Sequence, residues 1–211
     1  SKKNKSKIVS LTAYSKNIAK ILDNHVDIIL VGDSMANVLY AHKNTHKISL
    51  KNIIQHSISV RQGVKRSLFV VDMPKGTYKN LKLAKKNARL VIKKTNCDAI
   101  KLESNGKNFQ IITQLVKKKI PVMGHIGFTP QFKKKFKIEG QTKNEALKLL
   151  KEAKQIEKAG AFSIVLECIS PLAAKLITNQ LNIPTIGIGS SSHCDGQVLV
   201  TDDMLGISGF Y

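Results

Sequence analysis

Eight short apolar runs limit the fold of this 211-residue chain more than any other feature. They lie at residues 8–13, 27–33, 67–73, 99–103, 120–127, 162–168, 183–189 and 197–202. Each run has the length of a β-strand, is rich in branched residues, and is continuous rather than alternating. Continuous apolar strands are typical of parallel sheets that are buried on both faces.

Lysine-rich segments with helical spacing separate these runs. In residues 80–94 and 143–159, apolar side chains recur every three or four positions, and Gly160 follows the second segment as a helix-ending cap. Eight strands that alternate with helices predict an α/β fold, a (β/α)8 TIM barrel, as a single domain over residues 1–211. A doubly wound sheet is the alternative. Because the chain ends soon after the eighth run, we expect the barrel to lack its C-terminal helix.

The net charge of +21 makes nucleic acids and other anions possible partners. Arginine occurs only at positions 61, 66 and 89, so nearly all of the positive charge comes from lysine. Lysine lacks the planar fork that suits bidentate contacts with bases and phosphates. We therefore expect solvated surface lysines and no specific binding of nucleic acid.

The sequence also predicts the compartment. No apolar run approaches the ~20 residues that cross a bilayer, and the lysine-rich N-terminus lacks the apolar core of a signal peptide. Cys97, Cys168 and Cys194 are far apart, which fits neither a disulfide framework nor a zinc site. We expect a cytoplasmic protein with reduced thiols and no association with a membrane.

Four carboxylates fall at the carboxyl ends of predicted strands: Asp33, Asp72, Glu103 and Glu167. In a parallel barrel these ends share one rim, where active sites form. Carboxylates gathered in a cleft are hard to keep ionised unless a cation lies among them, and Mg²⁺ prefers oxygen ligands. The sequence therefore predicts a magnesium site, although any one of these acids taken alone could be a helix cap or a loop residue.

Two basic side chains are candidates for the same rim. Lys101 alternates with Glu103, so both point to one side of their strand, where the ammonium could hold the carboxylate or developing oxyanion of a substrate. His125 lies near the end of its strand and could donate to a substrate oxygen or carry a proton. A surface lysine and a core histidine bonded to the backbone are the alternatives.

The glycine-rich segment 187–196 matches neither a dinucleotide-binding nor a P-loop motif. It predicts a plain turn after a strand, with Asp195 as a further candidate for the rim. Cys194 has a histidine beside it but no group to orient that base, so we expect no cysteine catalysis.

Seven strings in order resemble the ketopantoate hydroxymethyltransferase (3-methyl-2-oxobutanoate hydroxymethyltransferase) family. They are LVGDS, VVDMPKGTY, IKLE, VMGHIGFTPQ, IVLECI, IPTIGIG and HCDGQVLV, and the resemblance spans residues 11–206. It implies a TIM barrel of the phosphoenolpyruvate/pyruvate superfamily. It also implies that methylene-tetrahydrofolate and Mg²⁺ are used to convert α-ketoisovalerate (3-methyl-2-oxobutanoate) into ketopantoate, in pantothenate biosynthesis.

The resemblance also implies roles for individual residues. The metal would be bound by Asp33, Asp72 and Glu103, the keto acid by Asp33, Ser34, Asp72, Lys101 and His125, and Glu167 would be the catalytic base. The family implies a homo-oligomer, commonly a decamer. The alternatives are another α-keto-acid carbon–carbon lyase or mutase of the superfamily, a basic nucleic-acid-binding protein, or an inactive divergent relative.

The chain departs from the family pattern in three places. Residues 41–47 read AHKNTHK where the family commonly has Gly-His-Asp-Ser-Thr-Leu-Pro, Lys75 replaces a Phe, and GIGSS at 187–191 replaces GIGAG. The implied metal and base positions are intact.

Overall fold

The computed structural model describes residues 6–133 and 135–208. Its eight parallel strands follow the chain in the order of a closed barrel, β1 to β8, so the predicted barrel is confirmed and the doubly wound alternative is wrong. The strands are β1 (Ile8–Thr12), β2 (Ile28–Val31), β3 (Leu68–Asp72), β4 (Ala99–Glu103), β5 (Val122–Gly127), β6 (Ser163–Glu167), β7 (Thr185–Ile188) and β8 (Gly196–Leu199).

Helices alternate with the strands. They are α1 (Lys16–Leu22), α2 (Met35–Val38), the 3₁₀ helix η1 (Thr45–Lys47), α3 (Leu50–Arg61), α4 (Leu81–Thr95), α5 (Phe109–Val116), α6 (Lys143–Lys158), α7 (Pro171–Gln180) and α8 (Thr201–Met204). The two segments with helical spacing correspond to α4 and α6, and Gly160 has the left-handed φ of +96° expected of a cap. We expected the barrel to lack its last helix. Instead, the four-residue helix α8 follows β8.

The chain divides into two compact units, which are described separately. The N-terminal unit comprises Val9–Ile100 and Val198–Tyr211, and the C-terminal unit comprises Ser1–Ile8 and Lys101–Gln197. A single domain over residues 1–211 remains a prediction.

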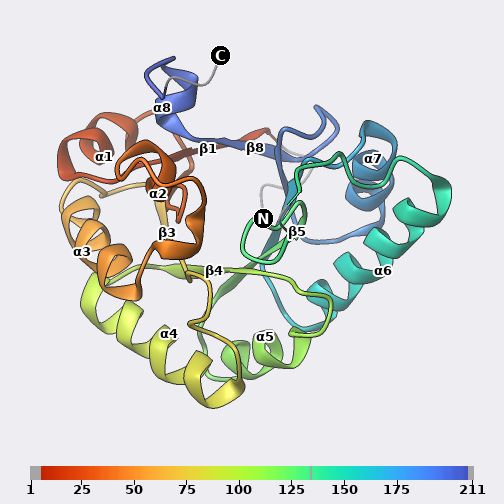
Figure 1. The fold of residues 1–211 in the computed structure, drawn as a ribbon, viewed down its shortest axis with the longest axis horizontal. Helices are drawn as coiled ribbons and strands as arrows, with labels where there is room; N and C mark the ends of the chain where they lie inside the picture. The colour runs from red at the N-terminus through yellow and green to blue at the C-terminus, as the bar shows by residue number, and fades with distance from the viewer. Residues whose placement is uncertain (1–5, 134, 209–211) are drawn as a thin grey trace. The chain divides into compact units, whose positions relative to one another are not determined.

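In the N-terminal unit, β2 pairs in parallel with β1 and β3. Leu30 lies opposite Val70 in this ladder, and all four residues of β2 are buried. Figure 1 shows α1, α3 and α4 as successive neighbours outside these strands. Helices on one face and core on the other explain why the apolar runs are continuous.

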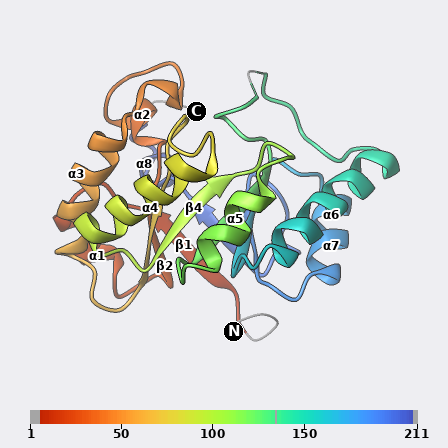
Figure 2. The same cartoon turned by 90° about the horizontal axis from the view of Figure 1, so that it is seen from below.

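In the C-terminal unit, β5, β6 and β7 form the corresponding parallel ladder. Gly127, the last residue of β5, lies opposite Glu167, the last residue of β6. Helices α5, α6 and α7 follow one another outside this ladder (Figure 2). The pairing therefore fixes the carboxyl ends of β5 and β6 at the same level.

An aspartate clamp recurs at the amino ends of three strands. The residue just before β2, β4 or β8 is an aspartate, and its carboxylate accepts a hydrogen bond from a backbone N–H at the start of the preceding strand. The pairs are Asp27 with Val9 at 3.1 Å, Asp98 with Phe69 at 2.8 Å and Asp195 with Thr185 at 2.9 Å. The placement of Asp195 at the rim was therefore wrong, because its carboxylate binds the first residue of β7, at the opposite end of that strand.

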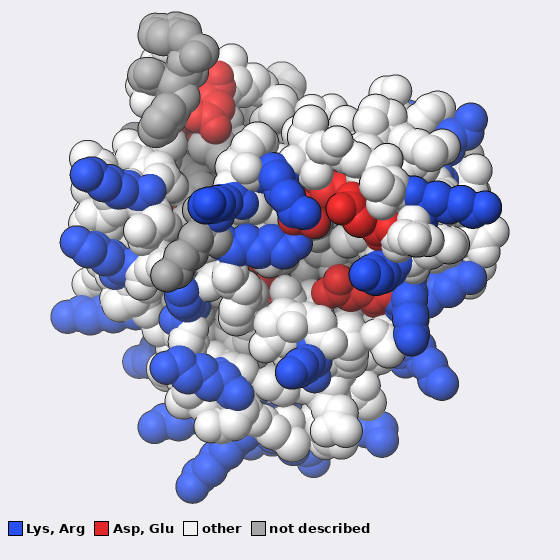
Figure 3. Space-filling model, turned by 45° about the vertical axis from the view of Figure 1, so that its right-hand side comes forward, with Lys and Arg blue, Asp and Glu red and all other residues white. Residues whose placement is uncertain are grey.

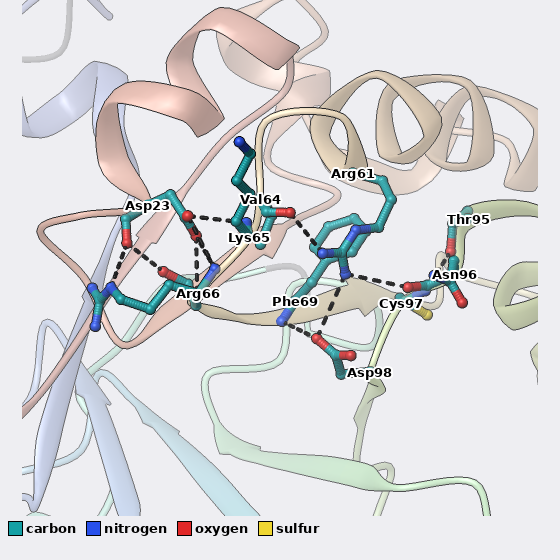
Figure 4. A network of polar contacts seen from close by, with 11 residues as sticks. Asp23, Arg61, Val64, Lys65, Arg66, Phe69, Thr95, Asn96, Cys97 and Asp98 are labelled. Atoms are coloured by element: carbon teal, nitrogen blue, oxygen red, sulfur yellow. Dashed lines mark hydrogen bonds and ion pairs between the residues drawn. The ribbon is translucent and has the colours of Figure 1, made fainter.

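A further aspartate, Asp23, joins the end of α1 to the turn before β3 (Figure 4). Its carboxylate accepts hydrogen bonds from the backbone N–H groups of Lys65, Arg66 and Ser67 at 2.9 to 3.1 Å. Burial alone would raise the pKa of Asp23, but these hydrogen bonds outweigh burial and lower that pKa. The ionised carboxylate therefore stabilises the entry into β3.

The three cysteines are free thiols, as predicted. Within residues 6–133 and 135–208, no helix is both long enough and apolar enough to span a bilayer. Lysine and arginine side chains are scattered over the face that Figure 3 shows rather than gathered into one patch. This distribution agrees with the prediction of solvated surface lysines.

Candidate functional site

The N-terminal unit brings three of the predicted site residues together. Asp33 follows β2, and Asp72 is the last residue of β3; both side chains are buried. The backbone N–H of Asp33 lies 3.4 Å from Asp72 Oδ2, and Ser34 is the next residue along the chain. Neighbouring parallel strands thus bring the backbone of Asp33 to the Asp72 carboxylate at their carboxyl ends.

Tyr14 belongs to this cluster, although the sequence did not single it out. Its phenol oxygen lies 2.8 Å from Ser34 Oγ. Burial raises the pKa of Tyr14 to about 12, partly offset by hydrogen bonds with Ser34 and Thr12. The phenol is therefore protonated near neutral pH and can orient the Ser34 hydroxyl. Its position just after the first apolar run was the one available signal.

The C-terminal unit brings together the other four predicted residues, which come from three strands. Lys101 and Glu103 lie on β4, His125 on β5 and Glu167 at the end of β6. His125 Nδ1 is 3.5 Å from Lys101 Nζ and 3.9 Å from Glu103 Oε1, and His125 Nε2 is 3.2 Å from Glu167 Oε2. The histidine ring thus lies between the basic and acidic groups of the cluster.

The side chains of this second cluster differ in their exposure to solvent. His125 and Glu103 have side chains that are 3% and 1% exposed, whereas the Glu167 side chain is 18% exposed. Glu103 Oε2 also accepts a hydrogen bond from the backbone N–H of Gln131 at 2.9 Å. Glu103 is therefore held from within the protein, while Glu167 can meet a ligand.

Backbone geometry fixes the position of Glu167. Gly127 has a φ of +93°, and a Cβ there would overlap the carbonyl oxygen of Glu167, so only glycine fits. The N–H of Phe128 donates to that same carbonyl at 2.9 Å. Cys168, directly after Glu167, also has a left-handed φ of 51°. Such conformations often occur at functional sites, where neighbouring structure holds them.

The N-terminal cluster contains oxygen groups of the kind that Mg²⁺ prefers. Mg²⁺ is usually bound through one or two carboxylates, with water and substrate completing its shell. Asp33 and Asp72, whose side chains are both buried, would supply two such carboxylates. No group of three or more histidine, cysteine or acidic side chains suited to a metal occurs in the described part of the chain. The role of Glu103 as a third ligand stays a prediction.

Two positions that depart from the family pattern contact each other. Lys75 Nζ lies 3.2 Å from both ring nitrogens of His46, which belongs to η1. Asn44 caps η1 by accepting a hydrogen bond from the N–H of His46 at 3.1 Å. The altered segment 41–47 is therefore an ordered turn with its own stabilising contacts.

Comparison with known proteins gives a consistent result. The family model described as ketopantoate hydroxymethyltransferase matches residues 1–210. The 3-methyl-2-oxobutanoate hydroxymethyltransferase of Pelagibacter ubique (strain HTCC1062) is 58% identical over 207 residues, which cover 98% of this chain and 80% of that protein. The enzyme of the same name from Anaplasma marginale (strain St. Maries) is 45% identical over 213 residues, covering 100% of this chain and 77% of that protein.

Solved structures agree on the fold. A 2,3-dimethylmalate lyase of the PEP mutase/isocitrate lyase superfamily aligns with a TM-score of 0.72 at 13% identity, covering 95% of this chain and 78% of that one. Phosphonopyruvate hydrolase in complex with oxalate and Mg²⁺ aligns with a TM-score of 0.73 at 11% identity, covering 96% and 78%. At these identities the likeness concerns the barrel alone. From its match over nearly the whole length, the chain belongs to the ketopantoate hydroxymethyltransferase family, a family of transferases.

Proposed function

We propose that this protein transfers a hydroxymethyl group from methylene-tetrahydrofolate to 3-methyl-2-oxobutanoate, forming ketopantoate for pantothenate biosynthesis. The observation that carries the proposal is the Glu167 carboxylate. It is fixed at the carboxyl end of β6 and is 18% exposed, whereas its histidine and glutamate neighbours are buried. A general base needs this combination of a fixed position and access to the substrate.

Asp33 and Asp72 would hold Mg²⁺, and Ser34 would contact the keto acid beside them. Bound Mg²⁺ supplies Lewis-acid chemistry, which polarises the keto oxygen and makes the neighbouring C–H more acidic. The ammonium of Lys101 would hold negative charge on the substrate, either its carboxylate or the developing oxyanion. The contact between Tyr14 and Ser34 would keep the serine hydroxyl in one orientation.

Glu167 would remove the proton from carbon 3 of the keto acid. That carbon forms a bond to the one-carbon unit, and both bonds from this unit to the two folate nitrogens break. Water supplies the hydroxyl oxygen, and the two nitrogens take up one proton from carbon 3 and one from water. Methylene-tetrahydrofolate is thus a co-substrate that leaves as tetrahydrofolate.

The test separates deprotonation from transfer. With Mg²⁺ and keto acid alone, exchange of the carbon 3 proton with deuterium from D₂O reports deprotonation; adding methylene-tetrahydrofolate should yield ketopantoate. We expect Glu167→Gln to reduce both rates by about 10²–10⁴-fold, the usual contribution of a general base. Glu145→Gln, the same change at a half-buried position in the first turn of α6, is the matched control.

Equal activity of Glu167→Gln and Glu145→Gln would contradict the assignment of the base. Asp72→Asn should raise the Mg²⁺ concentration needed for half-maximal exchange, because one of two adjacent carboxylates loses its charge. Turnover of a different α-keto acid without any need for folate would instead favour a lyase or mutase of the same superfamily.

We further propose that the protein acts in the cytoplasm as a homo-oligomer without specific affinity for nucleic acid or membranes. The scattered lysines in Figure 3 support the proposal that the protein has no specific affinity for nucleic acid. Light scattering on the purified protein measures the assembly. Retention on DNA that persists at high salt would contradict the absence of specific binding.

A further inference from the structure

We propose that His125 is a positioning residue, which holds the Glu167 carboxylate with its Nε2–H edge, and that Lys101 fixes the ring tautomer required for this. The inference rests on the proposed function of Glu167 as the base. It gives His125 a role through Glu167, in place of the direct contact with substrate predicted from the sequence.

The partners of the two ring nitrogens determine the tautomer. Lys101 Nζ lies 3.5 Å from Nδ1, and an ammonium only donates hydrogen bonds, so Nδ1 must accept. The carbonyl oxygen of Phe128 lies 3.1 Å from Nε2 and only accepts, so Nε2 carries the hydrogen. Both contacts place a hydrogen at Nε2, and the 3.9 Å from Nδ1 to Glu103 Oε1 is too long for a hydrogen bond that would place one at Nδ1.

The backbone ties this ring to Glu167 in a closed circuit. The carbonyl of Phe128 accepts from His125 Nε2, and the N–H of Phe128 donates to the carbonyl of Glu167. The Glu167 carboxylate then returns to the histidine, with Oε2 3.2 Å from the same Nε2. The Nε2 edge therefore faces the Phe128 carbonyl and the Glu167 carboxylate, and Phe128 is linked through its own backbone groups to both residues.

Burial shows which of the two residues can act on a ligand. The side chain of His125 is 3% exposed, and Lys101 closes its Nδ1 side. The Glu167 side chain is more accessible, and holding one carboxylate oxygen leaves the other available for the substrate proton. His125 would therefore affect the reaction through the orientation of Glu167. Loss of such a supporting contact typically costs about 10–100-fold in activity, in line with the roughly 100-fold cost of a 1 Å misplacement.

Two substitutions distinguish the roles of the ring nitrogens. The amide nitrogen of glutamine in His125→Gln can take the place of Nε2, whereas that of asparagine in His125→Asn lies nearer to the place of Nδ1. We expect His125→Asn to lower kcat and the rate of deuterium exchange by about 10–100-fold, with the KM for keto acid changed less than about threefold. His125→Gln should stay within about fivefold of the natural protein, because the donor to Glu167 is restored.

The control is His25→Asn, at an exposed turn after α1, which should leave both rates unchanged. Circular dichroism of each variant confirms folding. Equal loss in His125→Gln and His125→Asn, or a rise in KM without a fall in kcat, would overturn the positioning role and favour direct contact with substrate.

A spectroscopic readout tests the tautomer without any need for activity. Long-range ¹H–¹⁵N correlation of histidine-labelled protein should show the His125 ring protonated at Nε2 only. Lys101→Met removes the donor to Nδ1 and should disturb this pattern. If the natural protein fails to exchange the substrate proton, the proposed function fails; a ring protonated at Nδ1 refutes the present inference, whichever way the exchange experiment turns out.

Discussion

The Asp23 carboxylate should contribute more to stability than the other aspartate in Figure 4, Asp98. Asp23 is 5% exposed, and its two oxygens accept hydrogen bonds from three consecutive backbone N–H groups. In Asp23→Asn one oxygen becomes an NH₂ group, which faces a backbone N–H as a second donor. One charge-assisted hydrogen bond is then lost, and the other two N–H groups keep a neutral acceptor.

Each hydrogen bond to a charged group contributes about 1.5–3 kcal/mol, so the expected cost of Asp23→Asn is about 2–4 kcal/mol. For a protein of this size, 1 kcal/mol corresponds to roughly 2–4 °C, which predicts a fall in Tm of about 5–15 °C. Thermal unfolding followed by circular dichroism at pH 7 measures this shift.

Asp98→Asn is the matched control. Asp98 accepts one backbone hydrogen bond, and its ion pair with Arg61 spans 3.8 Å with the Asp98 side chain 45% exposed. Exposed pairs contribute about 0–1 kcal/mol, and asparagine can still accept the single hydrogen bond, so the Tm should fall by no more than about 4 °C. Equal shifts in the two variants would refute the argument from the number of N–H donors.

The pH dependence has a definite sign. Because the folded pKa of Asp23 is lowered, its contribution is complete above the unfolded pKa, about 3.9, and is lost as the pH falls through the folded value. The difference in stability between the natural protein and Asp23→Asn should therefore be constant from pH 5 to 7 and shrink below about pH 4. A difference that grows on acidification would contradict the lowered pKa.

Two further predictions concern the C-terminal unit and the thiols. Gly127→Ala should lower the free energy of unfolding by more than about 3 kcal/mol and reduce activity, because the new Cβ would overlap the Glu167 carbonyl. Gly106 has a similar φ, and a Cβ there would meet nothing within 4 Å, so Gly106→Ala should cost only the backbone strain of about 1–2 kcal/mol. Urea unfolding measures both changes. Burial raises the pKa of Cys97 to about 11, and burial with the Glu167 charge does the same for Cys168, so alkylation at pH 8 should be slow in the folded protein and fast in urea. Rapid labelling of either cysteine in the folded protein would show that these thiols are more accessible or more acidic than the structure indicates.

Much of the barrel could be predicted from the apolar runs alone. The run at 99–103 coincides with β4, because every residue of this strand is buried, Lys101 and Glu103 included. The run at 27–33 extends beyond β2, since Gly32 and Asp33 have already left the ladder to enter the turn to α2. A run of apolar residues shows which residues are buried. Burial continues past the last hydrogen bond of a strand, so the run can be longer than the strand.

The approach of Asp33 to Asp72 follows from topology, but the supporting contacts of the predicted site residues do not. The approach of Asp33 to Asp72 needs only neighbouring parallel strands, which the pattern predicts. The bond from Gln131 to Glu103 arises in a loop, where sequence does not specify the path of the backbone. The same applies to Asp195: its residue type suggested a functional carboxylate, and only the structure shows that it binds Thr185.

The recurrent aspartate clamp has a consequence for the folding pathway. Its three pairs join residues separated by 18, 29 and 10 positions, short distances for a protein of parallel strands. Closing short loops costs less chain entropy than closing long ones. Each aspartate clamp can therefore align its two segments early in folding and independently of the other clamps. Strand alignment then depends on acids at the amino ends, so the acids at the carboxyl ends can evolve for catalysis.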